Sequence, residues 1–294
     1  MSDLLEVKEE LVSSCIGECH GTFGELIQGV LPSGRHFLVT LPINVKSVVE
    51  YMATETRTVE ANFHNKSKSV SAVKKYLQMH GLHPGGSLRF RLTFPAGKGL
   101  SSSSADMVAS IRATANYFKL DASPEIIESI LREIEPTDGV MYDGVVSYYH
   151  REARLEEKIG RAPRLVIISA DRGGECNTIE FNKNKQSVSL EMKFEYEAML
   201  AAIKHAILNN DLTLLGRLST RSSELSQLSN PNPHFALMNQ LRADTDALGI
   251  AATHSGTCLG LLYSIDDPEH LAKASLALNH LTSRDIDCNK FLSI

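Results

Sequence analysis

The sequence predicts an α+β fold. Short segments that alternate apolar with polar residues dominate the first half, and longer segments with apolar residues at helical spacing dominate the second half. Strands and helices are mixed without the strict alternation of a doubly wound sheet. The chain has 294 residues, 43% of them hydrophobic, and can bury one large core or two closely packed ones. We predict two domains, residues 1–163 and 164–294.

The elements of the first domain follow from local patterns. Leu88, Phe90, Leu92 and Phe94 alternate with polar residues, which is typical of a half-buried strand. By the same reasoning we predict strands at residues 14–16, 36–41, 47–53, 58–63 and 87–94. Helices are predicted at 70–80, which Gly81 ends, at 105–118 and at 124–134.

The second domain begins with a largely apolar strand that follows Pro163. This strand is predicted at residues 164–170, and a further strand at 258–265. Helical patterns occupy residues 192–209, 212–228, 234–248 and 268–281. There is no internal repeat.

The net charge and the lack of a targeting pattern argue against nucleic-acid-binding, secreted and membrane-spanning proteins. The net charge of −5 argues against a nucleic-acid-binding protein, which would normally carry a basic face. The acidic start of the chain lacks a signal-peptide pattern, and no apolar run approaches the roughly 20 residues needed to cross a bilayer. We therefore expect a cytoplasmic protein, and an enzyme rather than a nucleic-acid-binding protein. The sequence leaves the oligomeric state open, and a homodimer is compatible with it.

The five cysteines are dispersed and odd in number, so we interpret them as reduced thiols. A metal site at Cys15, Cys19 and His20 is the alternative. It is disfavoured because no second ligand pair at zinc spacing follows.

One loop, residues 95–106, has the composition of a phosphate-binding segment. Gly97 and Gly99 let the backbone approach an anion closely, and Lys98 supplies charge. Four successive hydroxyls and the N-terminus of the following helix provide donors. The donors are Ser101, Ser102, Ser103 and Ser104. Asp106 is expected in the first turn of that helix, where a carboxylate compensates the helix dipole.

A flexible Gly/Ser linker is the alternative interpretation of this loop. The context favours a binding loop, because the segment runs from an alternating strand directly into an Ala-rich helix, and Pro95 fixes the turn. The loop is no Walker A motif, since Gly99 follows Lys98 where Ser or Thr would be needed. No G-x-G-x-x-G fingerprint occurs in the chain.

Three motifs in order resemble those of the GHMP kinases. The central motif P-x-x-x-G-L-x-S-S-x-A is matched at Pro95, Gly99, Leu100, Ser102, Ser103 and Ala105. The first motif is similar to residues 21–29, which contain Gly24 and Glu25, and the third to residues 253–257. The resemblance spans nearly the whole chain. It implies a ribosomal-protein-S5-like N-terminal domain, a ferredoxin-like C-terminal domain, and ATP and Mg²⁺ as cofactors.

A narrower resemblance is to the L-threonine kinase branch, which is associated with cobalamin biosynthesis. The segments that carry it are G-T-F-G-E-L-I-Q-G, F-L-V-T-L-P-I, G-K-G-L-S-S-S-S-A-D, E-P-T-D-G-V-M and H-S-G-T. The chain departs from the branch at Cys19 and His20, where the branch more often has proline before Gly21. The resemblance implies phosphorylation of L-threonine to O-phospho-L-threonine.

The resemblance also implies roles for single residues. Asp138, in a turn after a helix, is the candidate for the aspartate near the attacking hydroxyl. An aspartate in an ordinary turn is the alternative, because Asp is common there for local hydrogen bonding. Lys98 is the second catalytic candidate, and Ser103 and Glu25 are the candidate metal ligands. Thr22, Glu25, His254, Ser255, Gly256 and Thr257 are the candidates for substrate binding.

The sequence leaves alternative functions open. L-threonine is the first candidate for the phosphoryl acceptor, and homoserine or another hydroxy acid is the second. A protein that keeps the fold and binds a ligand without catalysis is a different class, against which the intact serine run and Asp138 count. The segments 148–151 and 171–174 are interpreted as ordinary turn and strand-end residues.

Overall fold

The computed structural model describes residues 15–83, 85–176 and 188–294. Position 14, where the first predicted strand begins, lies outside this part, as does the N-terminal segment expected to carry no signal peptide. The α+β class is confirmed. The strands are β1 (Ile16–Val30), β2 (His36–Met52), β3 (Val59–Ala61), β4 (Gly86–Leu92), β5 (Val145–Tyr149), β6 (Arg154–Gly160), β7 (Leu165–Asp171), β8 (Gly249–Ala252), β9 (Cys258–Ser264) and β10 (Asp287–Leu292). The helices are α2 (Ser67–Met79), α3 (Ser102–Phe118), α4 (Pro124–Leu131), α6 (Leu190–Leu208), α7 (Leu212–Ser226), α8 (Phe235–Asp244) and α9 (His270–Thr282).

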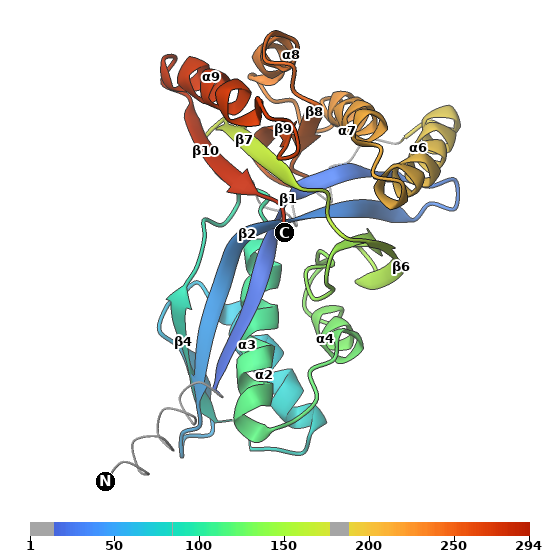
Figure 1. Ribbon diagram of the computed structural model, residues 1–294. Coiled ribbons are helices and arrows are strands. Elements are labelled where there is room, and N and C mark those ends of the chain that lie inside the picture. Colours follow the sequence, from blue (N-terminus) through green and yellow to red (C-terminus); the bar gives the residue numbers. More distant parts are fainter. Residues whose placement is uncertain (1–14, 84, 177–187) are drawn as a thin grey trace.

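A long antiparallel hairpin, β1 with β2, runs through the molecule (Figure 1). The sheet continues from β2 to β4 and β3 on one side, and from β1 to β8, β9, β7 and β10 on the other. The two sides are joined where Glu25 of β1 lies opposite Ala252 of β8. Strands of both halves of the chain thus share one sheet, and the boundary between residues 163 and 164 stays a prediction.

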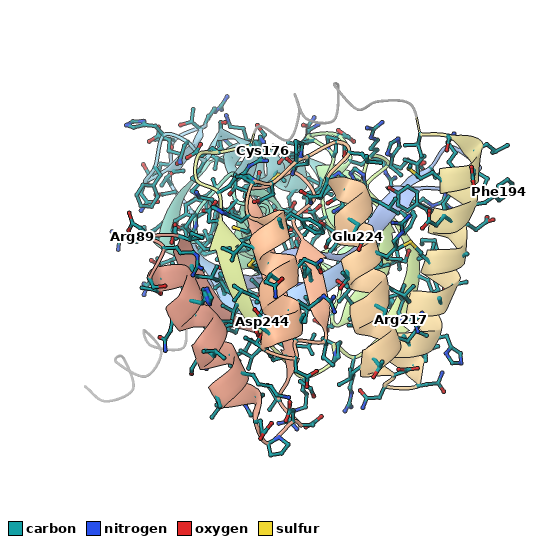
Figure 2. All side chains as sticks on the ribbon, turned by 90° about the horizontal axis from the view of Figure 1, so that it is seen from above. Arg89, Cys176, Phe194, Arg217, Glu224 and Asp244 are labelled. Carbon is teal, nitrogen blue, oxygen red and sulfur yellow. The ribbon has the colours of Figure 1, made fainter. Side chains whose placement is uncertain are left out.

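The helices cover the sheet in two groups. Helices α2, α3 and α4 lie beside the lower part of the hairpin, and α6, α7, α8 and α9 lie above the upper strands (Figure 1). Seen from above, this second group forms a row (Figure 2). One apolar cluster fills the space between the first group and the sheet, and two further clusters lie beneath the row. No helix in the described part of the chain is both long and apolar enough to cross a bilayer.

Helix α3 lies unusually close to β1, and this explains its small residues. A Cβ atom added to Gly17 of β1 would lie 2.2 Å from the carbonyl oxygen of Ala109 and 2.2 Å from the amide nitrogen of Ala113. Both alanines are fully buried. Such close packing fixes the axis of α3, and therefore the place of its N-terminus, relative to the hairpin.

The structure merges two predicted strands. Residues 36–41 and 47–52 belong to the single strand β2, although Pro42 lies between them, and the second predicted strand ran one residue too far. Pro42 is opposite Thr22, at a register shift of the hairpin. Proline lacks an N–H group and is tolerated in a strand at such a bulge, where the ladder is already interrupted. The predicted interruption between residues 41 and 47 was therefore wrong.

Candidate active site

The loop before α3 and the first turn of α3 form the floor of a cleft. Gly97, Gly99 and Ser101 have positive φ angles of 72°, 80° and 61°. The first intrahelical bond is donated by the amide of Ala105 to the carbonyl of Ser101, at 2.9 Å. The amides of residues 102–104 precede this bond, so they are the orphan donors of a helix N-terminus. These donors and the helix dipole favour an anion at this place.

The first motif reaches this loop through bulges in β1. The β1–β2 register shifts between His20 and Thr22, between Thr22 and Glu25, and between Glu25 and Ile27. Backbone amides are thereby turned away from β2. The amide of Thr22 donates to the carbonyl of Leu100 at 3.2 Å, and that of Gly24 donates to the carbonyl of Gly99 at 3.2 Å. The bulges are what brings the first and central motifs into contact.

The third motif packs on the other side of the loop. The amide of Thr257 donates to the carbonyl of Lys98 at 3.3 Å. A Cβ atom on Gly256 would lie 2.2 Å from that same carbonyl oxygen, and one on Gly99 would lie 2.4 Å from the Cβ of Thr253. Only glycines permit this approach.

The cleft above this floor has a volume of about 590 Å³. Eleven of the residues predicted for the site line it: Glu25, Gly97, Gly99, Leu100, Ser101, Ser102, Ser103, Ser104, Asp138, His254 and Ser255. The other five, Pro95, Lys98, Thr22, Gly256 and Thr257, are not part of the lining. Of these five, Thr22, Lys98 and Thr257 make the contacts that hold the loop in place.

Three of the serine hydroxyls tie the loop to the turn that carries Asp138. Ser101 Oγ donates to Asp138 Oδ2 at 2.6 Å and lies 2.6 Å from Thr22 Oγ1. Ser104 Oγ accepts from Thr137 Oγ1 at 2.7 Å and from the amide of Asp138 at 3.3 Å. Ser103 Oγ donates to a carboxylate in the same turn, that of residue 135, at 2.6 Å. The hydroxyls therefore set the distance between the anion site and the acid.

Asp138 is held in a rigid turn at the side of the cleft. The amide of Thr137 donates to the carbonyl of His150 at 3.1 Å, and that of Val140 donates to the carbonyl of Asp138 at 2.8 Å. Burial raises the pKa of Asp138, and the nearby charge of Glu135 adds to this, while the hydrogen bond from Ser101 lowers it; the net result is a raised pKa. A carboxylate with a raised pKa is a better proton acceptor than an ordinary aspartate.

Lys98 is not part of the cleft lining. Its Nζ lies 2.6 Å from Asp171 Oδ2 and donates to the carbonyl of Gly174 at 2.9 Å. Burial alone would raise the pKa of Asp171, but hydrogen bonds from Lys98, Thr257 and the amide of Gly173 bring it below its ordinary value. The hydrogen bond that Lys98 donates to Asp171 in turn raises the pKa of Lys98. A phosphate contact by Lys98 stays a prediction.

Asp106 does not lie where the sequence predicted. Helix α3 begins at Ser102, so Asp106 is in its second turn, and no acidic residue occupies the first. Asp106 is buried and accepts from Ser47 Oγ at 2.5 Å and from Lys66 Nζ at 2.6 Å. The side chain pairs with a lysine that is only 12% exposed and gives no support to the helix N-terminus.

Several residues that line the cleft were not predicted from the sequence. Lys68, Glu135, His150, Glu175 and Cys176 also line it. Glu135 lies in the recognised E-P-T-D-G-V-M segment, which was a usable signal. His150 lies just past β5, in the segment 148–151 that was set aside as ordinary, and its ring centroid is 4.4 Å from that of His254. Lys68 lies in the first turn of α2, and nothing in the sequence separates it from a surface lysine.

Comparisons with known proteins agree with this geometry. Residues 65–151 match the family described as GHMP kinases N terminal domain. An L-threonine kinase of Citrobacter freundii is 25% identical over 252 residues, 84% of this chain and 85% of that protein. The mevalonate kinase of Methanococcus jannaschii superposes with a TM-score of 0.76 at 16% identity, over 95% of this chain and 98% of the other. A homoserine kinase from Cytophaga hutchinsonii superposes with a TM-score of 0.74 at 15% identity, over 95% of this chain and 93% of the other. The resemblance indicated by the three motifs is confirmed, and the fold is that of the GHMP kinases.

Proposed function

We propose that this GHMP-type kinase transfers the γ-phosphoryl group of ATP to the side-chain hydroxyl of a small hydroxy amino acid, with L-threonine as the first candidate. One observation carries the proposal: the anion-binding N-terminus of α3 and Asp138 share one cleft, joined by the 2.6 Å bond from Ser101. The amino-acid acceptor is supported by the similarity to a protein named L-threonine kinase and by the E-P-T-D-G-V-M segment.

The residues of the cleft suit phosphoryl transfer, in which positioning and charge stabilisation do most of the work. The amides at the start of α3 would hold phosphate oxygens. The acceptor hydroxyl would lie against Asp138, which either accepts its proton or orients it. Glu25, His254 and Ser255 line the same cleft and would contact the rest of the acceptor.

The cleft also offers the oxygen ligands that Mg²⁺ prefers. Glu25, Ser103 and Glu135 line it, and the hydroxyl of Ser103 is already bonded to Glu135 at 2.6 Å. Mg²⁺ bound with a nucleotide usually keeps several waters and takes only one or two carboxylates. These residues therefore fit the ion and would hold it, and the ion would supply positive charge against the phosphates.

A panel assay tests the proposal. The purified protein is incubated with ATP and Mg²⁺ and with L-threonine, homoserine, serine or mevalonate, and phosphorylated products are identified by mass spectrometry. We expect phosphorylation of L-threonine with the highest kcat/KM. A preference for homoserine would make homoserine, not L-threonine, the assigned acceptor. If no hydroxy amino acid were phosphorylated, the proposal of an amino-acid acceptor would be refuted.

Replacing Asp138 separates an enzyme from a binding protein. Asp138→Asn should lower kcat by about 10²–10⁴-fold if the carboxylate takes the proton, with nucleotide affinity nearly unchanged. Asp143→Asn is the matched control, because Asp143 is exposed, follows the same turn and is not part of the cleft lining. Equal rates for the two variants would remove Asp138 from the mechanism.

A further inference from the structure

The charges of the cleft leave a problem for binding a polyphosphate. Four carboxylates line it: Glu25, Glu135, Asp138 and Glu175. Lys68 is the only lysine or arginine among the described residues of the lining. A nucleoside triphosphate brings several more negative charges into the same space, and like charges at short range repel strongly where water is scarce. The helix N-terminus supplies only a partial positive charge.

Lys68 reaches the cleft from the first turn of α2. Its ammonium contacts Glu135, whose other carboxylate oxygen accepts from Ser103 Oγ at 2.6 Å. The Lys68 side chain is 44% exposed, whereas that of Glu135 is only 5% exposed. The carboxylate is thus buried in the wall of the cleft, next to the first turn of α3, and the ammonium that contacts it belongs to a partly exposed side chain.

The other two lysines near the loop have different partners. Lys66 is paired at 2.6 Å with the buried Asp106 and is only 12% exposed, and Lys98 is paired at 2.6 Å with Asp171. Neither is part of the lining. Of these three lysines, Lys68 combines a place in the cleft lining with a 44% exposed side chain, and a lysine ammonium can exchange one anionic partner for another.

We propose that Lys68 is the lysine that binds the nucleotide phosphates, and that Glu135 is its partner when no nucleotide is bound. On nucleotide binding the ammonium turns from Glu135 to a phosphate oxygen. Glu135 keeps its bond from Ser103, and its second oxygen becomes available to a cation. The inference rests on the proposed function only in taking a nucleotide as the phosphoryl donor.

Nucleotide binding measured without acceptor tests the proposal directly. ADP is titrated by calorimetry in the presence of EDTA into the full chain, its Lys68→Met and Lys68→Arg variants, and Lys75→Met. Loss of a charged hydrogen bond should lower the affinity for ADP by at least about 10-fold in Lys68→Met. Lys68→Arg should recover most of this, and the salt dependence of binding should fall in Lys68→Met.

Lys75→Met is the control. Lys75 lies on the same helix and forms an exposed ion pair with Glu133, with side chains 37% and 65% exposed, and it is not part of the cleft lining. We expect its ADP affinity to change by less than about twofold. Thermal unfolding of each variant verifies that the fold is kept, and Lys68→Gln serves as a second neutral variant.

A double variant distinguishes phosphate binding from mere neutralisation of Glu135. If Lys68 only offsets that carboxylate, Lys68→Met combined with Glu135→Gln should bind ADP like the original protein. Removing the charge of Glu135 also removes repulsion of the phosphates, so we expect the double variant to regain part of the affinity lost in Lys68→Met but to stay clearly weaker than the original protein. Full recovery of affinity, or unchanged affinity in Lys68→Met, overturns the proposal. Because no acceptor is present, failure of the hydroxy amino acid panel leaves this result intact, and the reverse also holds.

Discussion

Replacing Gly99 by alanine probes the contact between the central and third motifs. A Cβ atom at this position would lie 2.4 Å from the Cβ of Thr253 and 2.9 Å from the Cα of Gly256. Carbon atoms in ordinary contact are about 3.5–4.0 Å apart, so the two segments must separate by about 1 Å. The change also places an L-residue at a φ of 80°.

Gly34→Ala is a matched control for the backbone part of this cost. Gly34 lies in the turn between β1 and β2, has a φ of 85°, and has no atom within 4 Å of an added Cβ. Both variants carry the left-handed strain of about 1–2 kcal/mol. The difference between them isolates the overpacking, for which we expect about 1–3 kcal/mol of additional loss in the free energy of unfolding.

Two measurements check this. Urea unfolding gives the free energy of unfolding for both variants, and steady-state kinetics gives kcat/KM for ATP. A 1 Å displacement at an active site costs about 100-fold in rate, so kcat/KM should fall by about that factor in Gly99→Ala and stay unchanged in Gly34→Ala. If Gly99→Ala matched Gly34→Ala in both measurements, the close packing of the two motifs would be refuted.

Two further predictions concern charged groups. The raised pKa of Asp138 means that the carboxylate protonates, and loses its function as a base, at a higher pH than an ordinary aspartate. The acidic limb of the pH profile of kcat/KM should therefore lie at a higher pH than for an ordinary aspartate. It should move higher still in Ser101→Ala, because this change removes a hydrogen bond that lowers the pKa, and it should be absent in Asp138→Asn. An acidic limb that neither change affects would contradict the assignment of Asp138 as the base. Lys66→Met should cost about 3–5 kcal/mol of unfolding free energy, because it leaves the buried carboxylate of Asp106 without its cation. Lys75→Met, at an exposed ion pair, should cost less than about 1 kcal/mol by the same chemical denaturation, and similar losses in the two would show that Asp106 is not effectively buried.

The elements with a strong periodic pattern could be predicted from the sequence, and those defined by their neighbours could not. The alternation at Leu88 and Phe90 and the helical pattern of α7 depend on the segment alone, and both are confirmed. Strands β6 and β10 are mostly polar and exposed, and β8 has only four residues. Such strands are formed by pairing with an existing sheet, which leaves little trace in local composition.

The same division holds for the cleft. The Gly/Ser loop, Glu25, Asp138 and His254 belong to compact motifs, and the structure brings them together. Lys68 could not be found, because its place in the cleft depends on where α2 packs against α3. The orientation of Lys98 could not be found either, since its partner Asp171 is 73 positions away in the sequence and meets it only through β7.

The glycines of the motifs acquire a more specific meaning from the structure. In the sequence they indicate close approach to an anion, yet Gly99 and Gly256 are packed against each other's segments. Main-chain bonds to the carbonyls of residues 98, 99 and 100 join all three motifs around this contact. These glycines therefore hold the motifs together, and under the proposed function the recognition of phosphate would fall to the amides of α3 and to side-chain cations. A protein that kept the glycines but lost Lys68 should keep this fold and bind nucleotides weakly.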